Sequence, residues 1–440
     1  QKENLLTFCR ELLGVSTEEL EDSLIDLKAT SKIVEEDKWI YLEPFFRAEQ
    51  NIAERIQILQ KANNVKRISH LEKDLKKIEK NSEIELSEKQ KEAIEAINEN
   101  NVCIITGGPG TGKTTIIKTV IELYEAQGKK VVLCAPTGRA AKRMTETTGK
   151  EAKTLHRLLE IGKQEEDIYE NVGKEVQPLD ADIVIVDEMS MVDLFLMNHL
   201  VKALFQGTKI VLVGDSDQLP SVGPGSILKD MISSEKVTTI TLNKIFRQAA
   251  SSKIILNSHR VNEGEKFLSK EDIKNEELQE DFFYINEANQ EKMLMQVISL
   301  CNGRLQKYGD YDFFKNIQVI TPTKKGMLGT KELNRTLQKY LNPPREGLLE
   351  KQMGEVIFRE NDRVMQIKNN YDILWERQGK NYEAGSGVFN GELGYIEKID
   401  EEEKLIQIKF DDEKVAWYAY TDLDQIEHSY SITIHKAQRK

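Results

Sequence analysis

The sequence predicts an α/β fold in which apolar strands alternate with helices, followed by a smaller β-rich segment. The first observation is the alternation itself, which begins at residue 86 and is typical of a parallel sheet covered by helices on both faces. The second is a glycine-rich stretch between the first strand and its helix. The third is a change to short, closely spaced β-type runs over residues 354–427.

Apolar periodicity defines the individual elements. A capping box formed by Ser87 and Gln90 marks the start of a helix. The predicted strands and helices that follow cover residues 102–106, 114–126, 130–135, 183–187, 192–204 and 209–213. A second α/β segment begins near residue 282, with a strand at 317–321 and a helix at 329–341. The later strands are predicted at 363–367, 394–399, 405–410 and 414–420, and a last one at 430–434 returns to the α/β unit.

These elements suggest a division into domains. Residues 1–85 are charged and mostly helical, and predict a winged-helix-like packing or docking region. The first α/β domain is predicted over residues 86–261, with polar residues 157–181 as an inserted hairpin. The second covers 262–353 and 428–440, with an incomplete C-terminal part, and receives an inserted small β-barrel at 354–427. The chain begins with Gln1 rather than methionine, which indicates a fragment or a processed chain.

The composition limits the class of protein. The 440 residues are 39% hydrophobic and 31% charged, and no apolar run approaches the roughly 20 residues that cross a bilayer. No secretory signal is expected from the polar start. Four cysteines without paired spacing argue against a zinc site or a disulfide framework, and favour a cytoplasmic location. The net charge of −12 argues mildly against indiscriminate polyanion binding, but is compatible with a local basic groove for nucleic acid.

The glycine-rich stretch at residues 107–114 reads Gly-Gly-Pro-Gly-Thr-Gly-Lys-Thr and matches the P-loop pattern. Its place between a strand and a helix makes the match specific, and disfavours a glycine-rich turn without a ligand. Backbone N–H groups and the helix N-terminus bind phosphate in such loops, while the lysine reaches the outer phosphates and the hydroxyl ligates Mg²⁺. ATP and Mg²⁺ are therefore the predicted cofactors. The predicted binding residues here are Gly108, Pro109, Gly110, Thr111, Gly112, Lys113, Thr114 and Thr115.

Two carboxylates, Asp187 and Glu188, follow the apolar run at 183–186. Asp187 is expected to hold Mg²⁺, directly or through water, and Glu188 to position and polarise the attacking water. Acidic residues that merely end a strand are the alternative, which the upstream P-loop disfavours. A third block at 214–220 follows the next strand and carries Gln218, a candidate sensor of the terminal phosphate. An Asp/Ser/Gly turn is its plainer interpretation. The two blocks lie side by side if their strands are neighbours.

With these three blocks, the chain resembles the RecD-like branch of superfamily 1 helicases over residues 86–438. The resemblance implies two RecA-like P-loop motor domains, with the small barrel, of SH3 type, inserted in the second. It implies that Gln90, in the block Leu-Ser-Glu-Lys-Gln at 86–90, reads adenine, beside or instead of its capping role. It also implies that Arg247, in Leu-Asn-Lys-Ile-Phe-Arg-Gln at 242–248, reaches the γ-phosphate; a surface arginine is the alternative. The implied catalytic residues are Lys113, Glu188, Gln218 and Arg247.

Three further blocks resemble the family's motifs for contact with the nucleic-acid strand. They read Ala-Pro-Thr-Gly-Arg-Ala-Ala at 135–141, Lys-Thr-Leu-His-Arg-Leu-Leu at 153–159 and Ser-Ile-Thr-Ile-His-Lys-Ala-Gln at 431–438. The implied nucleic-acid-binding residues are Pro136, Thr137, Arg139, Thr154, His156, Thr433 and His435. The last block departs from the family, which continues with a glycine and an acidic residue where this chain has Arg439 and Lys440. The family's sixth motif is absent, so this chain is expected to bind ATP yet hydrolyse it poorly.

The resemblance implies an ATP-dependent helicase that moves 5′-to-3′ on single-stranded DNA, with duplex junctions and with repair or recombination proteins as partners. Weak sequence preference is expected, because the grip comes from phosphate contacts and base stacking. Residues 157–181 form a hypothetical wedge that splits the duplex. The alternatives are an ATP-switched accessory subunit of a nuclease complex, an RNA helicase and a small-molecule P-loop kinase, which the blocks around Gln218 and Arg247 disfavour. No membrane contact is expected.

Overall fold

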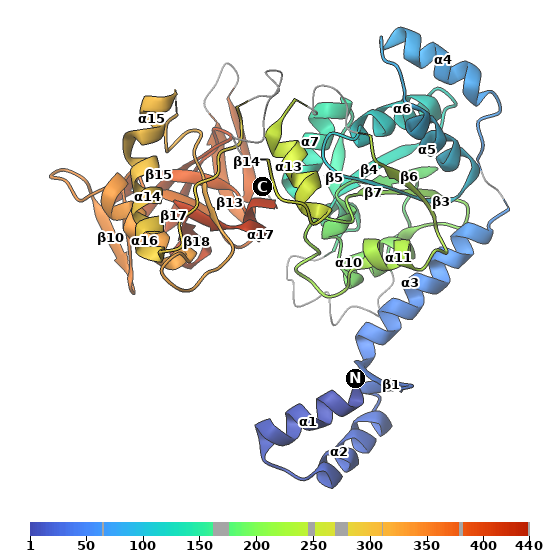
Figure 1. Cartoon of the computed structure of the whole chain (residues 1–440), viewed down its shortest axis with the longest axis horizontal. Coiled ribbons are helices and arrows are strands. Elements are labelled where there is room, and N and C mark those ends of the chain that lie inside the picture. Colours follow the sequence, from blue (N-terminus) through green and yellow to red (C-terminus); the bar gives the residue numbers. More distant parts are fainter. Residues whose placement is uncertain are drawn as a thin grey trace. The chain divides into compact units, whose positions relative to one another are not determined.

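The computed structural model forms two compact units, Gln1–Phe283 and Tyr284–Lys440 (Figure 1). The residues that it describes are 1–63, 66–161, 176–244, 251–268, 280–309, 311–377 and 382–438. The division falls later than the boundary predicted between residues 261 and 262, and the predicted domain limits stay predictions. Among the described residues, no helix is both long enough and apolar enough to cross a membrane.

The N-terminal region is mostly helical, as the sequence predicts. Its elements are α1 (Lys2–Leu13), α2 (Thr17–Ala29), β1 (Ile33–Glu36), β2 (Trp39–Leu42), α3 (Glu43–Lys61) and α4 (Leu71–Asn81). Strand β2 pairs antiparallel with β1. Helix α3 packs against α10 (Leu194–Ala203), where the guanidinium of Arg55 donates to the carbonyl oxygens of Val201 (3.2 Å) and Leu204 (2.5 Å). These carbonyls lie at the end of α10 and need partners, so α3 attaches this region to the larger domain.

A six-stranded sheet forms the centre of the first unit. Its order is β5-β4-β6-β7-β3-β8 and all neighbours are parallel, which confirms the predicted parallel sheet. The predicted strands are β3, β4, β6 and β7, whereas the sequence did not indicate β5 and β8. The bounds are β3 (Val102–Gly107), β4 (Val131–Ala135), β5 (Ala152–Thr154), β6 (Ile183–Val186), β7 (Lys209–Gly214) and β8 (Thr238–Leu242).

Helices cover both faces of this sheet, as expected for apolar parallel strands (Figure 1). Successive strand residues point to opposite faces, so Ile104 and Leu212 join one buried cluster with α3 and α10. Ile105 and Val213 join a second cluster with α5 and α6. The helices not yet given are α5 (Glu88–Glu99), α6 (Lys113–Glu125), α7 (Gly138–Thr148), α8 (Leu155–Leu158), η1 (Met189–Met191), α11 (Ile227–Ser233) and α13 (Lys253–Asn262).

Lys209, at the start of β7, is buried and holds the C-terminal end of α5. Its ammonium donates to the carbonyl oxygens of Ile97 (2.8 Å), Asn98 (3.1 Å) and Asn100 (2.7 Å). Burial lowers the pKa of Lys209 to about 8. We expect Lys209→Met to lower the free energy of unfolding by about 1–3 kcal/mol, because it leaves these carbonyls without their donor. Urea unfolding, with hydrogen exchange of α5, measures the effect; the exposed Lys236→Met is the control, and equal stability of the two variants contradicts the expectation.

The second unit combines a short parallel pair with a larger antiparallel sheet. Strand β9 (Val319–Thr321) pairs in parallel with β19 (Ser431–Thr433), which confirms the predicted return of the chain. Two strands do not establish a second RecA-like domain. The helices around them are α14 (Gln290–Ser299), η2 (Leu300–Arg304), α15 (Leu305–Tyr308), α16 (Thr330–Leu341) and α17 (Ile434–Gln438).

The β-rich segment forms a seven-stranded antiparallel sheet with the order β14-β13-β17-β16-β15-β12-β18. Four of its strands match predicted ones, whereas β13, β14 and β18 were not predicted. Among the described residues the pairing ends at β14 and β18, so a closed barrel is not confirmed. The bounds are β12 (Arg363–Gln366), β13 (Asn370–Arg377), β14 (Glu383–Val388), β15 (Leu393–Asp400), β16 (Leu405–Phe410), β17 (Val415–Ala419) and β18 (Ile426–His428), with the separate hairpin β10 (Glu350–Met353) and β11 (Val356–Arg359) and the turn η3 (Tyr420–Gln425).

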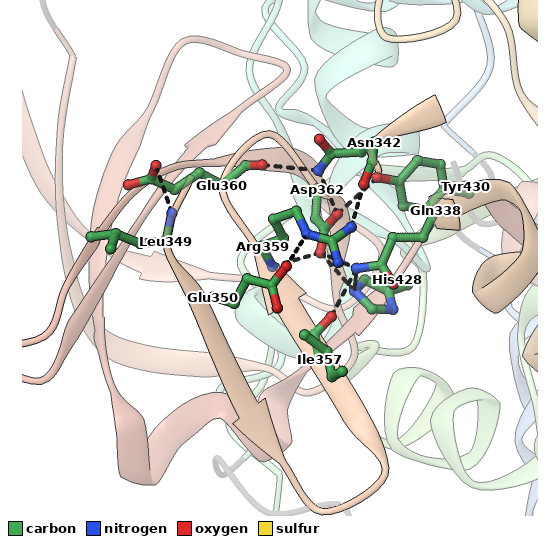
Figure 2. A network of polar contacts seen from close by, with 10 residues as sticks. All are labelled: Gln338, Asn342, Leu349, Glu350, Ile357, Arg359, Glu360, Asp362, His428 and Tyr430. Carbon is green, nitrogen blue, oxygen red and sulfur yellow. Dashed lines mark hydrogen bonds and ion pairs between the residues drawn. The ribbon is translucent and has the colours of Figure 1, made fainter. Parts of the chain in front are cut away.

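A buried carboxylate ties these elements of the second unit together. Asp362 is completely buried in the turn that precedes β12. Figure 2 shows the polar groups that surround it. At 2.6–3.0 Å its oxygens accept hydrogen bonds from the side chains of Gln338, Asn342, His428 and Tyr430 and from the backbone N–H of Arg359. Gln338 lies in α16 and Asn342 directly after it, Arg359 lies in β11, His428 lies in β18, and Tyr430 directly precedes β19. The side chain of Asp362 therefore joins the parallel pair to the antiparallel sheet.

Candidate nucleotide-binding site

The P-loop lies where the sequence predicts it, between β3 and α6. Gly107 ends β3 with no room for a side chain, since a Cβ there would stand 2.7 Å from the carbonyl oxygen of Leu242 and 2.9 Å from Oγ1 of Thr111. Gly112, with φ 84°, adopts the left-handed conformation that glycine tolerates and precedes the first residue of α6. The loop therefore turns the N-terminus of α6 and its free N–H groups toward the space a phosphate would fill.

Lys113 reaches back over this loop. Its Nζ donates to the carbonyl oxygens of Gly107 and Gly108, the latter at 3.0 Å. Desolvation lowers the pKa of Lys113, and the negative charges of Asp215, Asp187 and Glu188 oppose that change. The lysine and all three carboxylates thus share one electrostatic environment. Phosphate oxygens are stronger acceptors for an ammonium than carbonyls, so a bound triphosphate would take Lys113 from this resting position.

The acidic pair lies at the end of β6, as the sequence predicts. Desolvation raises the pKa of Asp187. The backbone N–H of Glu188, which donates to Oδ1 of Asp187 at 2.9 Å, and the positive charge of Lys113 lower this pKa in part. Desolvation also raises the pKa of Glu188, and Asp187 adds to this. Two partly buried carboxylates with raised pKa values suit a divalent cation, which would offset their desolvation. Asp187 with the Thr114 hydroxyl therefore remains the predicted Mg²⁺ set.

The backbone of Glu188 is strained. It has φ 53° and ψ 42°, in the left-handed region, which costs a residue with a side chain about 1–2 kcal/mol. The strand β6 ends at Val186, and the short helix η1 begins at Met189, so Glu188 makes the turn between them. Strain of this kind persists where the surroundings dictate it and is common at functional sites.

The third predicted block lies beside the acidic pair, because β7 pairs with both β6 and β3. This confirms the expected neighbourhood of the two strands. The N–H of Ser216 donates to Oγ1 of Thr106 on β3 (3.2 Å), which joins the block to the strand of the P-loop. Gln218 follows in a turn, where its own N–H donates to the carbonyl oxygen of Asp215 (3.3 Å). The role of its side chain as a phosphate sensor stays a prediction.

Gln90 has the capping role that the sequence predicts. Its Oε1 accepts from the N–H of Ser87 (2.9 Å), and the Ser87 hydroxyl accepts from the N–H of Gln90 (3.3 Å). Its Nε2 also donates to the carbonyl oxygen of Gly112 (3.3 Å). The side chain thus connects the start of α5 to the P-loop, while the adenine contact stays a prediction.

The residues predicted to contact nucleic acid fall on two units. In the first unit, β4 and β5 are neighbours, with Ala135 paired to Thr154. Thr137 and Thr154 cap α7 and α8, accepting from N–H groups three residues further on (3.2 Å each). These blocks therefore meet at one edge of the sheet, where Pro136 and His156 are half-buried and Arg139 is exposed. Thr433 and His435 belong to the second unit. Arg247 and most of the predicted hairpin, residues 162–175, lie outside the described residues.

One charged residue near the catalytic side chains was not predicted. Arg143, on α7, lowers the pKa of Lys113, Asp187 and Glu188 through its charge, although it is exposed. It stands six residues after Thr137 in a helix rich in cations, and no motif distinguishes it from Lys142. Only the folded position of α7, next to the strand that pairs with β6, reveals the proximity.

The chain is similar to several known proteins. The model of an AAA domain matches residues 90–224, and the model of the ATP-dependent RecD-like DNA helicase SH3 domain matches residues 333–410. The ATP-dependent RecD2 DNA helicase of Deinococcus radiodurans is 32% identical over 91% of this chain and 50% of its own length. The RecBCD enzyme subunit RecD of Buchnera aphidicola (subsp. Schizaphis graminum) is 29% identical over 91% of this chain and 73% of its own. The crystal structure of Pif1 helicase from Candida albicans is 18% identical, covers 81% of this chain and 86% of its own, and has a TM-score of 0.42.

The P-loop lies between β3 and α6, and two carboxylates follow the end of β6. Together they define an ATP-binding P-loop protein of the AAA type. The two matched models and the relatives show that the chain is similar to RecD-type DNA helicases over most of its length. The chain spans half the length of the Deinococcus relative. The chain therefore combines an AAA-type α/β domain with a segment similar to the SH3 domain of these helicases.

Proposed function

We propose that the chain is the ATP-driven motor of a helicase that moves 5′-to-3′ along single-stranded DNA, in repair or recombination. The observation that carries this proposal is the shared environment of Lys113, Asp187, Glu188 and Asp215 at the ends of β3, β6 and β7. A lysine for the outer phosphates, a carboxylate for Mg²⁺ and a second carboxylate for water are the parts that phosphoryl transfer to water needs. Two RecA-like domains, the second with an inserted small barrel, are the architecture that goes with this proposal.

In this proposal Thr114 and Asp187 hold Mg²⁺, and Gln90 contacts adenine. Gln218 and Arg247 contact the terminal phosphate. The strand binds to the blocks after β4, β5 and β19. The cations Arg139, Lys142, Arg143, Lys153 and Arg157 surround the first two blocks and supply the local basic surface that an acidic chain needs for nucleic acid.

The test is ATP hydrolysis with and without single-stranded DNA. We expect the strand to stimulate the slow hydrolysis by the chain. The Lys113→Ala variant should show no stimulation, because it lacks the cation for the outer phosphates. Single-stranded RNA in the same assay distinguishes an RNA helicase. Hydrolysis that no strand stimulates, with ATP still bound, contradicts a nucleic-acid-driven motor.

The second candidate is an ATP-switched accessory subunit of a nuclease complex. Its supporting observation is the similarity to a protein named as a RecBCD enzyme subunit. Unwinding of duplexes with a single 5′ or 3′ tail separates the two candidates. A motor that acts alone unwinds the 5′-tailed duplex, whereas an accessory subunit unwinds neither by itself.

A further inference from the structure

Helix α13 places the side chain of His259 against the P-loop. A Cβ added to Gly108 would stand 2.6 Å from Cε1 of the imidazole. The ring's Nε2 lies 3.5 Å from the carbonyl oxygen of Pro109. A hydrogen bond of this length is weak, so the ring stands against the loop without a strong partner there, and a better acceptor would replace this contact at little cost.

Helix α13 also has other contacts that hold it. The Ser252 hydroxyl caps the helix, and Asp281 accepts from that hydroxyl (2.5 Å) and from the N–H of Lys253 (2.9 Å). Asn257 is buried, and its Oδ1 accepts from the N–H of Leu268 (2.7 Å). These hydrogen bonds and the buried Asn257 hold the helix with His259 next to the P-loop.

The imidazole lies beside Gly108 and Pro109, near the start of the P-loop. Lys113, which reaches those phosphates in P-loops, rests with its ammonium 3.0 Å from the carbonyl oxygen of Gly108, the residue that His259 covers. An imidazole N–H is a good donor to a phosphate oxygen, and charge-assisted hydrogen bonds are about twice as strong as neutral ones. The ring and the ammonium therefore stand beside the same loop residue, each able to donate to one phosphate group.

We propose that His259 is a nucleotide-binding residue that donates a hydrogen bond to the terminal phosphate of ATP and so distinguishes ATP from ADP. This inference rests on the proposed function, because it assumes that the P-loop binds ATP. A purely structural role is the competing explanation: the ring would then only pack α13 against the loop, with the same effect on both nucleotides.

The experiment measures binding of Mg²⁺-AMP-PNP, a non-hydrolysable ATP analogue, and of Mg²⁺-ADP to the whole chain by calorimetry. Three variants are compared: His259→Ala, His259→Phe, which keeps a ring without a donor, and Ser258→Ala, an exposed control on the same helix. We expect both His259 variants to bind AMP-PNP about tenfold to a hundredfold more weakly, the value of one hydrogen bond to a charged group. Binding of ADP should stay within about twofold, and Ser258→Ala should match the unmodified chain.

The outcomes separate this inference from the proposed function. Selective loss of AMP-PNP binding in both His259 variants supports it. Equal weakening of both nucleotides, or restoration of AMP-PNP binding by the phenylalanine ring, shows that His259 only packs and overturns it. Normal binding of AMP-PNP by both His259 variants overturns it too, while the function stands. If the unmodified chain binds AMP-PNP no better than Lys113→Ala does, the nucleotide site itself is wrong and both proposals fail.

Discussion

Glu188→Gln is expected to lower the turnover of ATP about 10²–10⁴-fold, the usual contribution of a positioned general base, while ATP still binds. The amide keeps the shape of the side chain but cannot accept a proton from the attacking water. Affinity should change little, because the loop and Lys113 bind the phosphates. Single-turnover hydrolysis, together with nucleotide titration, measures both quantities on the same variant.

Local structure favours Glu188 over Asp187 for this proposed role. Asp187 uses Oδ1 to accept the N–H of Glu188, which fixes its carboxylate close to the strand end. The left-handed backbone of Glu188 turns the next side chain away from the direction that the strand would give it. Desolvation has the largest effect on the pKa of Glu188 and raises it, and the negative charge of Asp187 raises it further. The positive charges of Lys113 and Arg143 lower it. A carboxylate with a raised pKa is a stronger base toward water.

The control for this variant is Glu235→Gln. Glu235 also has a left-handed backbone, with φ 54°, but it is exposed in the turn after α11. The two variants make the same chemical change in the same backbone conformation, so a difference in turnover reports the site. Turnover that falls less than about threefold in Glu188→Gln, well below the range for a general base, would show that another group activates the water.

The parts of the fold that the sequence predicts well are the locally encoded ones. The strands β3, β6 and β7 are continuous apolar runs, and the P-loop and the carboxylates directly follow them. The capping box at Ser87 involves residues three apart and was therefore visible. Once β6 and β7 proved to be neighbours, the three blocks had to meet, because the carboxyl ends of parallel strands share an edge of the sheet.

The parts that were not predicted depend on contacts between distant residues. His259 meets Pro109 across 150 positions, and Arg143 affects Glu188 through the placement of a whole helix. Strand β13 has a mixed pattern and a register shift between Asn370 and Leu374, which removes the alternation that identifies a strand. No local pattern marks such residues, since their neighbours in sequence carry none of the chemistry.

Asp362→Ala is expected to destabilise the second unit by about 3–5 kcal/mol, the cost of removing one partner from a buried charged network. Five donors would lose their acceptor, and each unpaired buried group costs about 1–3 kcal/mol before relaxation. The hydroxyl of Tyr430 is one of them: burial raises its pKa, and the negative charge of Asp362 raises it further. Tyr430 therefore stays a donor.

Tryptophan fluorescence during urea unfolding can follow this unit by itself. Of the three tryptophans, Trp375 and Trp417 lie in the antiparallel sheet, and a Trp39→Phe background removes the one in the first unit. In that background Asp362→Ala should shift the fluorescence transition to lower urea concentration. Asp372→Asn, an exposed change on β13, should change the free energy of unfolding by no more than about 0.5 kcal/mol.

Nucleotide binding at the P-loop, in the first unit, should survive both changes. Asp362 joins α16, β12 and β18 to Tyr430, which directly precedes the strand β19 that ends in Thr433. Loss of DNA-stimulated hydrolysis in Asp362→Ala with normal ATP binding would therefore show that the nucleic-acid contacts proposed for the last block depend on this network. Unchanged unfolding would instead mean that the five donors find other partners, and that the parallel pair and the antiparallel sheet hold together without the carboxylate.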